Sequence, residues 1–333
     1  MKAFVTGGTG FVGSHLVEAL LARGHQVRCL VRTPAKAAAL FGTPGGLELV
    51  VGDLEDNAAL RRGAADVDHV FHVAGLTGAW RKAELHRVNR GGTERVLAAA
   101  ASAAPRLARF VHVSTLSAAG PSRRGTPRRE SDPDTPVSGY GRSKLAAESA
   151  VRAGPVPWTI VRPPSVYGPR DVEFLRLFRL AKLGVVPFTG DPDQELSLVH
   201  GRDLAAAILA ATAPACTGRT YYACHPEVVS GRTLVSTIAR AVNETLGRPM
   251  ERAPALLAIP SPIAGLALWA SGALAALRGR ATPLTLDKLP ELRAEAWVCS
   301  PAALERDTGW RATIALEEGA RDTARWYRER GWV

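Results

Sequence analysis

Tyr140 and Lys144 are the two side chains of this sequence whose types and spacing point most directly to acid–base chemistry. They stand four positions apart at the predicted start of a helix, and residues with this spacing share one helix face. A free phenol has a pKa of about 10, which is too high for efficient proton exchange at neutral pH. A nearby lysine cation favours the phenolate and lowers that pKa. The alternative is an ordinary tyrosine at a helix start, followed by a surface lysine.

A glycine-rich phrase near the amino terminus has the form of a phosphate-binding turn. Residues 6–13 read TGGTGFVG and stand between a predicted strand and a predicted helix. The first glycine of the fingerprint permits a tight turn, the second lets the backbone approach a pyrophosphate, and the third lets helix and strand pack closely. The helix start offers free N–H groups and a partial positive charge to the phosphates. The residues expected to contact a dinucleotide here are Gly7, Gly10, Phe11, Val12 and Gly13.

Arg32 bears on which dinucleotide binds. An acidic residue at the end of the second strand would bind the ribose hydroxyls of NAD, but that strand ends in Leu30-Val31-Arg32. An arginine can instead pair with a ribose 2′-phosphate through charge-assisted hydrogen bonds. The sequence therefore favours NADP over NAD, with an arginine that stacks on the adenine or faces water as the alternative.

Short apolar runs alternate with helical stretches through the first half of the chain. The runs are 3–5, 27–31, 47–51, 69–73, 110–113 and 158–161, and the helical stretches include 14–22, 84–101 and 143–152. This alternation predicts parallel strands joined by crossover helices, and hence an α/β fold with a Rossmann-type doubly wound sheet. Runs that are apolar along their whole length fit strands that are covered on both faces.

The pattern loosens after residue 161, because prolines and glycines interrupt it. The later elements that we expect are helices at 172–183, 203–211, 233–246 and 316–328 and strands at 196–200 and 220–223. We expect a dinucleotide-binding domain over 1–165, with a returning segment near 196–225. A smaller C-terminal substrate-binding region would comprise 166–195 and 226–333.

Composition narrows the class of protein. Hydrophobic residues make up 46% of the 333 residues, which excludes wholesale disorder. The formal net charge is +11, but the arginines are spread along the chain and no nucleic-acid-binding motif is visible, so we expect no nucleic-acid partner. The four cysteines lack metal-ligand or disulfide-framework spacing, so we expect reduced thiols and no metal. Without a cleavable apolar stretch after Met1, these features favour a cytoplasmic protein.

The segment 253–277 contains no charged residue and has arginines on both sides. Its length approaches that of a membrane span, but its prolines leave an uninterrupted stretch of about fifteen residues, which is short for spanning. A buried or pocket-covering helix is one interpretation. A helix that lies on an anionic membrane surface is another, and it would make the protein membrane-associated.

Together, these motifs resemble the extended branch of the short-chain dehydrogenase/reductase superfamily, the NAD-dependent epimerase/dehydratase family. Further matching phrases extend the resemblance over nearly the whole chain; they are Gly52-Asp53-Leu54, Phe71-His72-Val73-Ala74, Val88-Asn89-Arg90-Gly91-Gly92-Thr93, Arg162-Pro163, Val166-Tyr167-Gly168-Pro169 and His200 with Asp203-Leu204-Ala205. The resemblance implies that Tyr140 exchanges the substrate proton, while Lys144 also holds the nicotinamide ribose.

The same resemblance implies further contacts with the cofactor. The residues that it places there are Asp53, Leu54, Val73, Ala74, Gly75, Pro163 and Val166. Asp53 and Leu54 would lie near the adenine and the turn after Val73 near the ribose. Considered alone, Asp53 could equally be a turn or cap residue. Asn89 resembles a helix asparagine that supports the active site in this family, with a simple polar helix residue as the alternative.

A hydroxyl just beyond the predicted strand 110–113 is expected to bind the substrate oxygen and stabilise its developing charge. The strand is followed by the phrase STLS. Counting back from Gly120, which matches a glycine of the family, points to Thr115, although most relatives carry serine there. Ser114 and Ser117 stay open as alternatives, as does a merely structural hydrogen bond to the backbone.

The resembled family divides between nucleotide-sugar enzymes and reductases of ketones, flavonoids and steroids. Nucleotide-sugar members usually clamp the diphosphate with an arginine and often carry an asparagine, and these positions are Leu196 and Ser165 here. The uncharged segment 253–277, followed by TPLT at 282–285, resembles the lipophilic arm of 3β-hydroxysteroid dehydrogenases. We therefore expect hydride transfer between a nicotinamide and a lipophilic ketone or secondary alcohol, as in 3β-hydroxysteroid dehydrogenases or dihydroflavonol reductases.

Two other functions stay open. A nucleotide-sugar epimerase or dehydratase would recycle its cofactor and need no external redox partner. A non-catalytic NADP-binding regulator is disfavoured by the presence of both Tyr140 and Lys144. The resemblance also allows a homodimer.

Overall fold

The apolar runs of the first half of the chain form one large parallel sheet. Its strands are β1 (Lys2–Thr6), β2 (Gln26–Val31), β3 (Leu47–Val51), β4 (His69–His72), β5 (Arg109–Val113), β6 (Trp158–Arg162) and β10 (Arg219–Tyr222). They lie in the order β10-β6-β5-β4-β1-β2-β3, and every neighbouring pair is parallel. The expected α/β class is confirmed in this computed structural model, which describes residues 1–79, 81–188, 190–249, 254–277 and 286–333.

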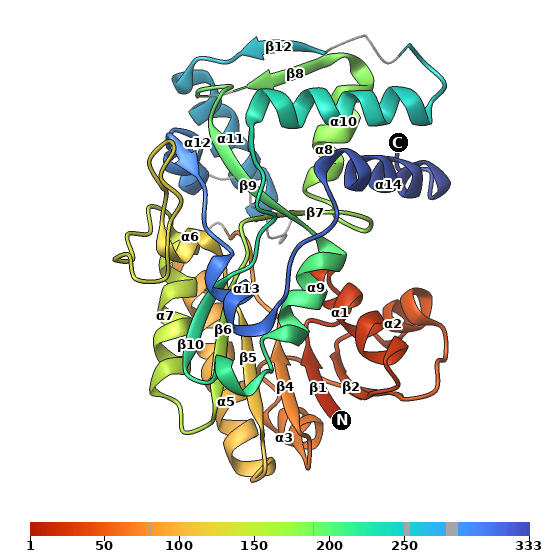
Figure 1. Cartoon of the computed structure of the whole chain (residues 1–333), viewed down its shortest axis with the longest axis vertical. Coiled ribbons are helices and arrows are strands. Elements are labelled where there is room, and N and C mark those ends of the chain that lie inside the picture. Colours follow the sequence, from red (N-terminus) through yellow and green to blue (C-terminus); the bar gives the residue numbers. More distant parts are fainter. Residues whose placement is uncertain (80, 189, 250–253, 278–285) are drawn as a thin grey trace.

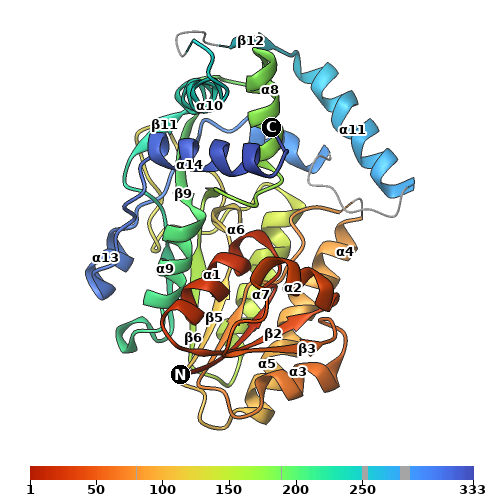
Figure 2. The same ribbon diagram turned by 90° about the vertical axis from the view of Figure 1, so that its right-hand side faces the viewer.

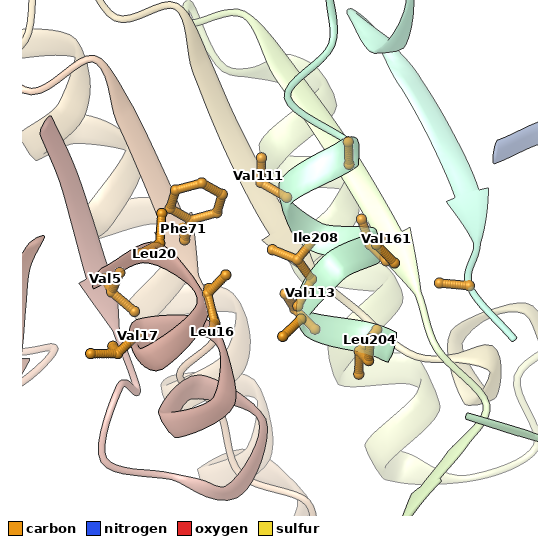
Figure 3. Close-up of a cluster of buried hydrophobic side chains, with 14 of the residues drawn as sticks. Val5, Leu16, Val17, Leu20, Phe71, Val111, Val113, Val161, Leu204 and Ile208 are labelled. Carbon is orange, nitrogen blue, oxygen red and sulfur yellow. The ribbon is translucent and has the colours of Figure 1, made fainter. Parts of the chain in front are cut away.

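Helices cover both faces of the sheet. They are α1 (Phe11–Ala22), α2 (Pro34–Phe41), α9 (Gly201–Ala210) and α13 (Ala302–Thr308) on one face, and α3 (Asn57–Ala64), α5 (Gly92–Ala103) and α7 (Gly139–Ala153) on the other. Phe4 and Val5 are neighbours in β1 and are both fully buried, each in the core of a different face. Leu16 of α1 and Ile208 of α9 pack over the same face as Val5 (Figure 3). The central strands β1, β4, β5 and β6 are buried along most of their length because helices cover both faces of the sheet.

The strand order reverses between β1 and β4. Chain connections leave these neighbouring strands toward opposite sides, which opens a crevice at their carboxyl ends, and ligands of doubly wound sheets bind there. The glycine-rich turn follows β1, the turn at residue 73 follows β4, and the phrase with Thr115 follows β5. The fold therefore brings three separate candidate segments to one edge of the sheet.

A smaller part of the molecule lies beyond this edge (Figure 1). Strands β7 (Ser165–Tyr167), β9 (Glu195–His200), β11 (Val228–Ser230) and β13 (Ala296–Trp297) form a four-stranded sheet, and β8 (Val185–Phe188) pairs with β12 (Ala255–Ala258). Its helices are α8 (Phe174–Leu183), α10 (Gly231–Thr245) and α14 (Leu316–Glu329). They share a core that includes Tyr167, Phe178 and Tyr327.

The stretch expected as one helix over 84–101 is divided. It comprises α4 (Lys82–His86), a π-helical turn η1 (Arg87–Gly91) and α5. A π-helical turn holds one extra residue and is frequent at functional sites. Asn89 lies inside this turn and is almost fully buried. The remaining short elements are α6 (Leu116–Ala119), η2 (Pro214–Cys216), η3 (Leu286–Lys288) and α12 (Leu289–Leu292).

The uncharged segment forms β12 and α11 (Ser261–Leu277), a helix at the periphery of the molecule (Figure 2). Four large apolar side chains of α11 are between 47% and 66% exposed; they are Ile263, Leu266, Trp269 and Leu274. The interpretation of α11 as a buried helix is therefore wrong for these four side chains. None of the helices in the described ranges is long and apolar enough to cross a bilayer. Ala253 and residues 282–285 lie outside the described residues.

Candidate active site

Tyr140 lies in the first turn of α7, where local hydrogen bonding fixes the helix start. Ser138 caps the helix, and its hydroxyl accepts a hydrogen bond from the N–H of Gly141 at 3.0 Å. A Cβ on Gly141 would lie 2.2 Å from the carbonyl oxygen of Ser117, so only glycine lets α7 approach the segment after β5 this closely. Tyr140 is thereby brought within hydrogen-bonding distance of Thr115.

Lys144 lies one turn after Tyr140 on α7 and is buried rather than exposed on the surface. Its Nζ donates to the carbonyl oxygen of Val113 at 2.8 Å and lies 3.4 Å from Nε2 of His112. Burial lowers the pKa of Lys144 to about 8, and the nearby carboxylate of Glu148 opposes this change. Burial and Lys144 together hold the pKa of His112 well below its usual value, so its Nε2 is a neutral acceptor.

The pKa of Tyr140 is raised above its ordinary value. Burial is the main cause, followed by the negative charge of Glu173, while the hydrogen bond with Thr115 acts in the opposite direction and Glu291 adds a smaller increase. The expectation of a lowered pKa is therefore wrong for the protein alone, because desolvation of the buried phenol is the largest effect on it. At neutral pH the phenol is protonated and can donate its proton.

The structure separates the three hydroxyls that follow β5. Ser114 donates to the carboxylate of Glu148 at 2.5 Å, and Glu148 in turn forms a buried ion pair with Arg162. The backbone N–H of Ser117 donates to the hydroxyl of Thr115 at 3.2 Å. Of the three, Thr115 is the residue whose hydroxyl lies at Tyr140.

Asn89 joins the turn after β4 to α7. Its Oδ1 accepts from the N–H of Leu76 at 2.7 Å, and its Nδ2 donates to the hydroxyl of Ser143 at 2.9 Å. A Cβ on Gly75 would lie 3.0 Å from Oδ1 of Asn89 and 3.9 Å from Nζ of Lys144, so these groups lie around one small space. Within the described part of the chain, the side chain of Asn89 hydrogen-bonds to Leu76 and Ser143 and not to Tyr140, which is the geometry of a supporting residue.

A chain of buried hydrogen bonds lies behind Asn89. The hydroxyl of Thr93 donates to the carbonyl oxygen of Asn89 at 2.6 Å, and His72 bonds to Thr93 at 2.9 Å and to the hydroxyl of Thr6 at 2.7 Å. Burial lowers the pKa of His72 to about 3, with a smaller contribution from Lys144, so the ring is neutral. This network links the strand before the glycine-rich turn to the π-helical turn, and sequence reasoning missed it.

The glycine-rich turn is shaped as a cradle. Gly7 has a φ of +74°, and a Cβ there would lie 2.6 Å from the backbone nitrogen of Ala74. A Cβ on Gly13 would lie 2.1 Å from the carbonyl oxygen of Gly7, whereas one on Gly10 would meet only that same oxygen, at 3.1 Å. The turn thus packs against β4 and α1 and leaves its open side at Gly10, which fits the backbone approach of a pyrophosphate.

The other predicted cofactor residues surround the same edge of the sheet. Arg32 is exposed directly after β2. Asp53 is exposed as well, and its Oδ1 accepts from the N–H groups of Glu55 and Asp56, so it stabilises a turn. Leu54 is half-buried and would lie 2.8 Å from a Cβ on Gly92.

The cofactor residues of the later segments have different surroundings. Phe11, Val12, Val73 and Ala74 are half-buried, and Gly75 is exposed. Pro163 is buried, and its carbonyl oxygen accepts from the N–H of Leu116, next to Thr115. Val166 lies half-buried in β7.

Two carboxylates close to Tyr140 were missed by the sequence analysis. Glu173 precedes α8 and accepts a hydrogen bond from the hydroxyl of Thr77 at 3.0 Å. Glu291 lies in α12. Both come from the smaller part of the molecule, 33 and 151 positions beyond Tyr140 (173 − 140 and 291 − 140). Neither stands in a recognisable motif, so no local signal in the sequence could have identified them.

Comparison with known proteins agrees with this geometry. Residues 3–223 match the model of the NAD dependent epimerase/dehydratase family. The chain is 33% identical to the ceramide reductase of Caulobacter vibrioides, over 99% of this chain and 95% of that protein. It is 30% identical to the 2-alkyl-3-oxoalkanoate reductase of Stenotrophomonas maltophilia, over 96% of this chain and 98% of that protein.

A solved structure shows the same arrangement over the full length. It is DesIV, a dTDP-glucose 4,6-dehydratase from Streptomyces venezuelae with NAD and TYD bound, which is 25% identical and covers 100% of this chain and 98% of its own, with a TM-score of 0.78. The family model, the reductases and the cradle after β1 lead to one conclusion. The chain is a nicotinamide-dependent oxidoreductase that belongs to the NAD-dependent epimerase/dehydratase family, within the extended short-chain dehydrogenases/reductases.

Proposed function

We propose that the chain reduces a lipophilic ketone to a secondary alcohol with NADPH. The observation that carries this proposal is that Tyr140 lies next to Thr115 and one turn before the buried Lys144 on the same helix. When bound, the nicotinamide supplies the hydride. Thr115 would hold the ketone oxygen by a hydrogen bond, and Tyr140 would donate its phenolic proton to that oxygen as negative charge develops there.

The protonation states favour the direction of reduction. A phenol whose pKa is raised keeps its proton at neutral pH, which suits a general acid. Lys144, with a pKa of about 8, is mostly cationic at neutral pH and would stabilise the phenolate that forms after proton transfer. Asn89 would hold α7 against the turn after β4 through its hydrogen bonds with Leu76 and Ser143.

The preference for NADPH rests on Arg32. Its guanidinium is exposed directly after β2, where it could pair with a ribose 2′-phosphate. The carboxylate of Asp53 is occupied by hydrogen bonds within its own turn. The adenine would therefore contact the backbone of Asp53 and the side chain of Leu54.

Three observations favour a lipophilic substrate over a nucleotide sugar. Leu196 packs on the core of the smaller part, so no cation stands where a diphosphate clamp would be expected. The carboxylates of Glu173 and Glu291 add negative charge near Tyr140, which disfavours an anionic substrate. Two relatives are named as reductases of ceramide, a lipid, and of 2-alkyl-3-oxoalkanoates, rather than of nucleotide sugars.

We further propose that α11 contacts the surface of an anionic membrane. The exposed apolar side chains of α11 continue into Leu257 of β12 and Val185 of the paired β8, and Arg248 and Lys182 lie beside these strands. Apolar side chains next to cations suit the headgroup boundary of anionic lipids. The protein should sediment with phosphatidylglycerol vesicles more than with phosphatidylcholine vesicles, and Leu266→Ser should weaken this binding. If the protein sedimented with neither kind of vesicle, or equally with both, the proposal would be contradicted.

A substrate panel tests the proposed reaction. Purified protein is mixed with NADPH and either a long-chain 3-oxoacyl ester, a steroid ketone, a flavonoid ketone or dTDP-glucose, and consumption of NADPH is followed by absorbance. We expect consumption with at least one lipophilic ketone and none with dTDP-glucose. Conversion of dTDP-glucose without net consumption of cofactor would instead support an epimerase or dehydratase, the alternative that the likeness to the dehydratase structure keeps in view.

A further inference from the structure

Residues 286–292 lie across the start of the catalytic helix, and we call this segment the clasp. It comprises η3 and α12. One carboxylate oxygen of Asp287 accepts from the N–H of Gly139 at 2.8 Å, and the other accepts from the N–H of Tyr140 at 3.1 Å. The first N–H groups of a helix have no partner within the helix, and a negative charge is favourable there. A residue nearly 150 positions away thus completes the first turn of α7.

The backbone of α7 is shaped to receive this carboxylate. A Cβ on Gly139 would lie 3.1 Å from both carboxylate oxygens of Asp287 and 3.2 Å from Cγ of Lys82. These separations are tighter than ordinary van der Waals contact. Glycine at this position therefore leaves the space that Asp287 occupies.

The next residue of the clasp covers the reactive side chain. Nζ of Lys288 lies 5.6 Å from the centre of the Tyr140 ring, which is within the range of a cation–π contact. The same Nζ forms an ion pair with Glu291 at 2.7 Å, which holds the ammonium in place. Lys288 is half-buried, so solvent screens this contact only in part.

The clasp is fixed at its far end to the smaller part of the molecule. The indole N–H of Trp297 donates to the carbonyl oxygen of Glu291 at 2.9 Å, and Trp297 belongs to β13. On another side, a Cβ on Gly265 of α11 would lie 3.9 Å from both Leu286 and Leu289. The clasp therefore joins three elements: the catalytic helix, the small sheet and the exposed apolar helix.

We propose that Asp287 and Lys288 are positioning residues for Tyr140, and that the clasp holds the phenol in the orientation needed for proton transfer. Asp287 fixes the backbone of Tyr140, and Lys288 restricts its ring. This inference rests on the proposed function, because it takes Tyr140 as the proton donor. A displacement of about 1 Å in a reacting group can lower a rate by about a hundredfold, so loss of this restraint should be visible in kcat.

Asp203 offers a matched control. Its carboxylate also accepts from two consecutive backbone N–H groups of a distant segment, those of Thr313 at 3.0 Å and Ile314 at 2.9 Å. It has no contact with Tyr140 among the described residues. Asp203→Asn thus weakens the same kind of clamp as Asp287→Asn does, without touching the catalytic helix.

The experiment compares Asp287→Ala, Asp287→Asn and Asp203→Asn with the wild-type protein, and measures kcat, KM, NADPH affinity and thermal unfolding. We expect Asp287→Ala to lower kcat by about tenfold to a hundredfold, with KM and NADPH affinity within about threefold. Asp287→Asn retains acceptor oxygen and should be intermediate. Asp203→Asn should keep the wild-type kcat. A kcat for Asp287→Ala within twofold of the wild type, or a loss no larger than that of Asp203→Asn, would overturn the proposal.

Lys288 is tested by removing its charge and then restoring it. Lys288→Met should lower kcat by roughly twofold to thirtyfold, and Lys288→Arg should recover most of that loss, since a cation over an aromatic ring contributes in this range. Equal losses in both variants would show that charge over the ring has no positioning role.

Hydrogen–deuterium exchange separates this inference from the proposed reaction. The peptide that contains Gly139 and Tyr140 should exchange faster in Asp287→Ala than in the wild type, while the same peptide in Asp203→Asn should not change. This measurement needs no substrate. If no ketone is reduced but the exchange differs as expected, the proposed function fails and the clasp stands; unchanged exchange refutes the clasp whatever the substrate.

Discussion

The two sides of Tyr140 are built in different ways. The side toward the large sheet is buried, and apart from the ammonium of Lys144 its hydrogen bonds join neutral groups, among them Asn89, Ser143 and Thr115. The side toward the smaller part carries charged groups at intermediate or full exposure, namely Glu173, Asp287, Lys288 and Glu291. The first arrangement fixes geometry at little electrostatic cost, and the second tunes charge where solvent still screens it. Substitutions on the two sides should therefore have effects of different size on kcat.

The largest effect is expected from Tyr140→Phe, which removes the hydroxyl that lies between the two sides. Loss of the general acid should lower kcat by about 10²- to 10⁴-fold, because no other acidic hydrogen takes its place. NADPH affinity, measured by fluorescence titration, should change little, since Lys144 and the glycine-rich turn remain. If the variant kept most of its turnover, Tyr140 would not be the proton donor.

Thr115→Val, on the buried side, is expected to have the next largest effect. It retains the branched shape but removes the hydroxyl, so kcat should fall by about a hundredfold. Thr115→Ser is the control and should keep activity within a few-fold. Steady-state kinetics of both variants decide the matter, and equal activity of the valine and serine variants would return the role to Ser114 or Ser117.

Arg32→Ala addresses the cofactor rather than the phenol. The dissociation constant of NADPH should rise by about tenfold or more, while that of NADH should stay nearly constant, because only NADPH carries the 2′-phosphate. Arg23→Ala removes an exposed arginine that follows α1 and should change neither constant. If Arg32→Ala weakened the binding of NADPH and NADH equally, Arg32 would only stack on the adenine.

The pH dependence of reduction should report the charge on Lys144. The pKa of Lys144 is lowered to about 8, so the ammonium is present below that pH and is lost as the pH rises through it. We expect kcat/KM for reduction to fall on the alkaline side of about pH 8, well before a tyrosine of ordinary pKa would titrate. Activity that stayed constant up to pH 10 would mean that the charge on Lys144 is not needed.

The smallest effect is expected from Glu173→Gln, on the charged side. Removal of this carboxylate should make Tyr140 a stronger acid and raise kcat by about threefold at most, because the group is exposed and screened. The gain should disappear at high salt. Glu48→Gln is the control, because Glu48 lies in β3, the outermost strand of the large sheet. A decrease in kcat would indicate that Glu173 binds substrate instead.

The sequence predicts the buried side far better than the charged side. Strands β1 to β6 and the turn after β1 follow from local patterns, since apolar runs, glycines and helix starts each have short-range causes. Asn89 stands in a recognisable phrase, yet the π-helical turn that directs it has no local signature. The direction of the Tyr140 pKa shift was predicted wrongly, because a sequence shows the nearby lysine but not the depth of burial.

The charged side depends on distant parts of the chain. Asp287 and Glu291 meet Tyr140 only after the chain has crossed the small sheet and α11, and nothing in their immediate sequence marks them. The loop 121–136 shows the same limit. Arg128 of this loop is buried, and its backbone pairs with Val298 and Ser300, about 170 positions further along the chain. Long-range pairing of this kind is not encoded in any short window.

The late arrival of β10 has a consequence for how the protein is made. The edge strand of the large sheet and the helix α9 on its face come from residues beyond 200, so a nascent chain that has emerged only to residue 165 has β6 as an open edge and part of its core uncovered. Unpaired edges and bare apolar faces favour association with other chains. The ribosome must therefore release more than fifty further residues before the sheet can close, and chaperones have most reason to bind during that interval.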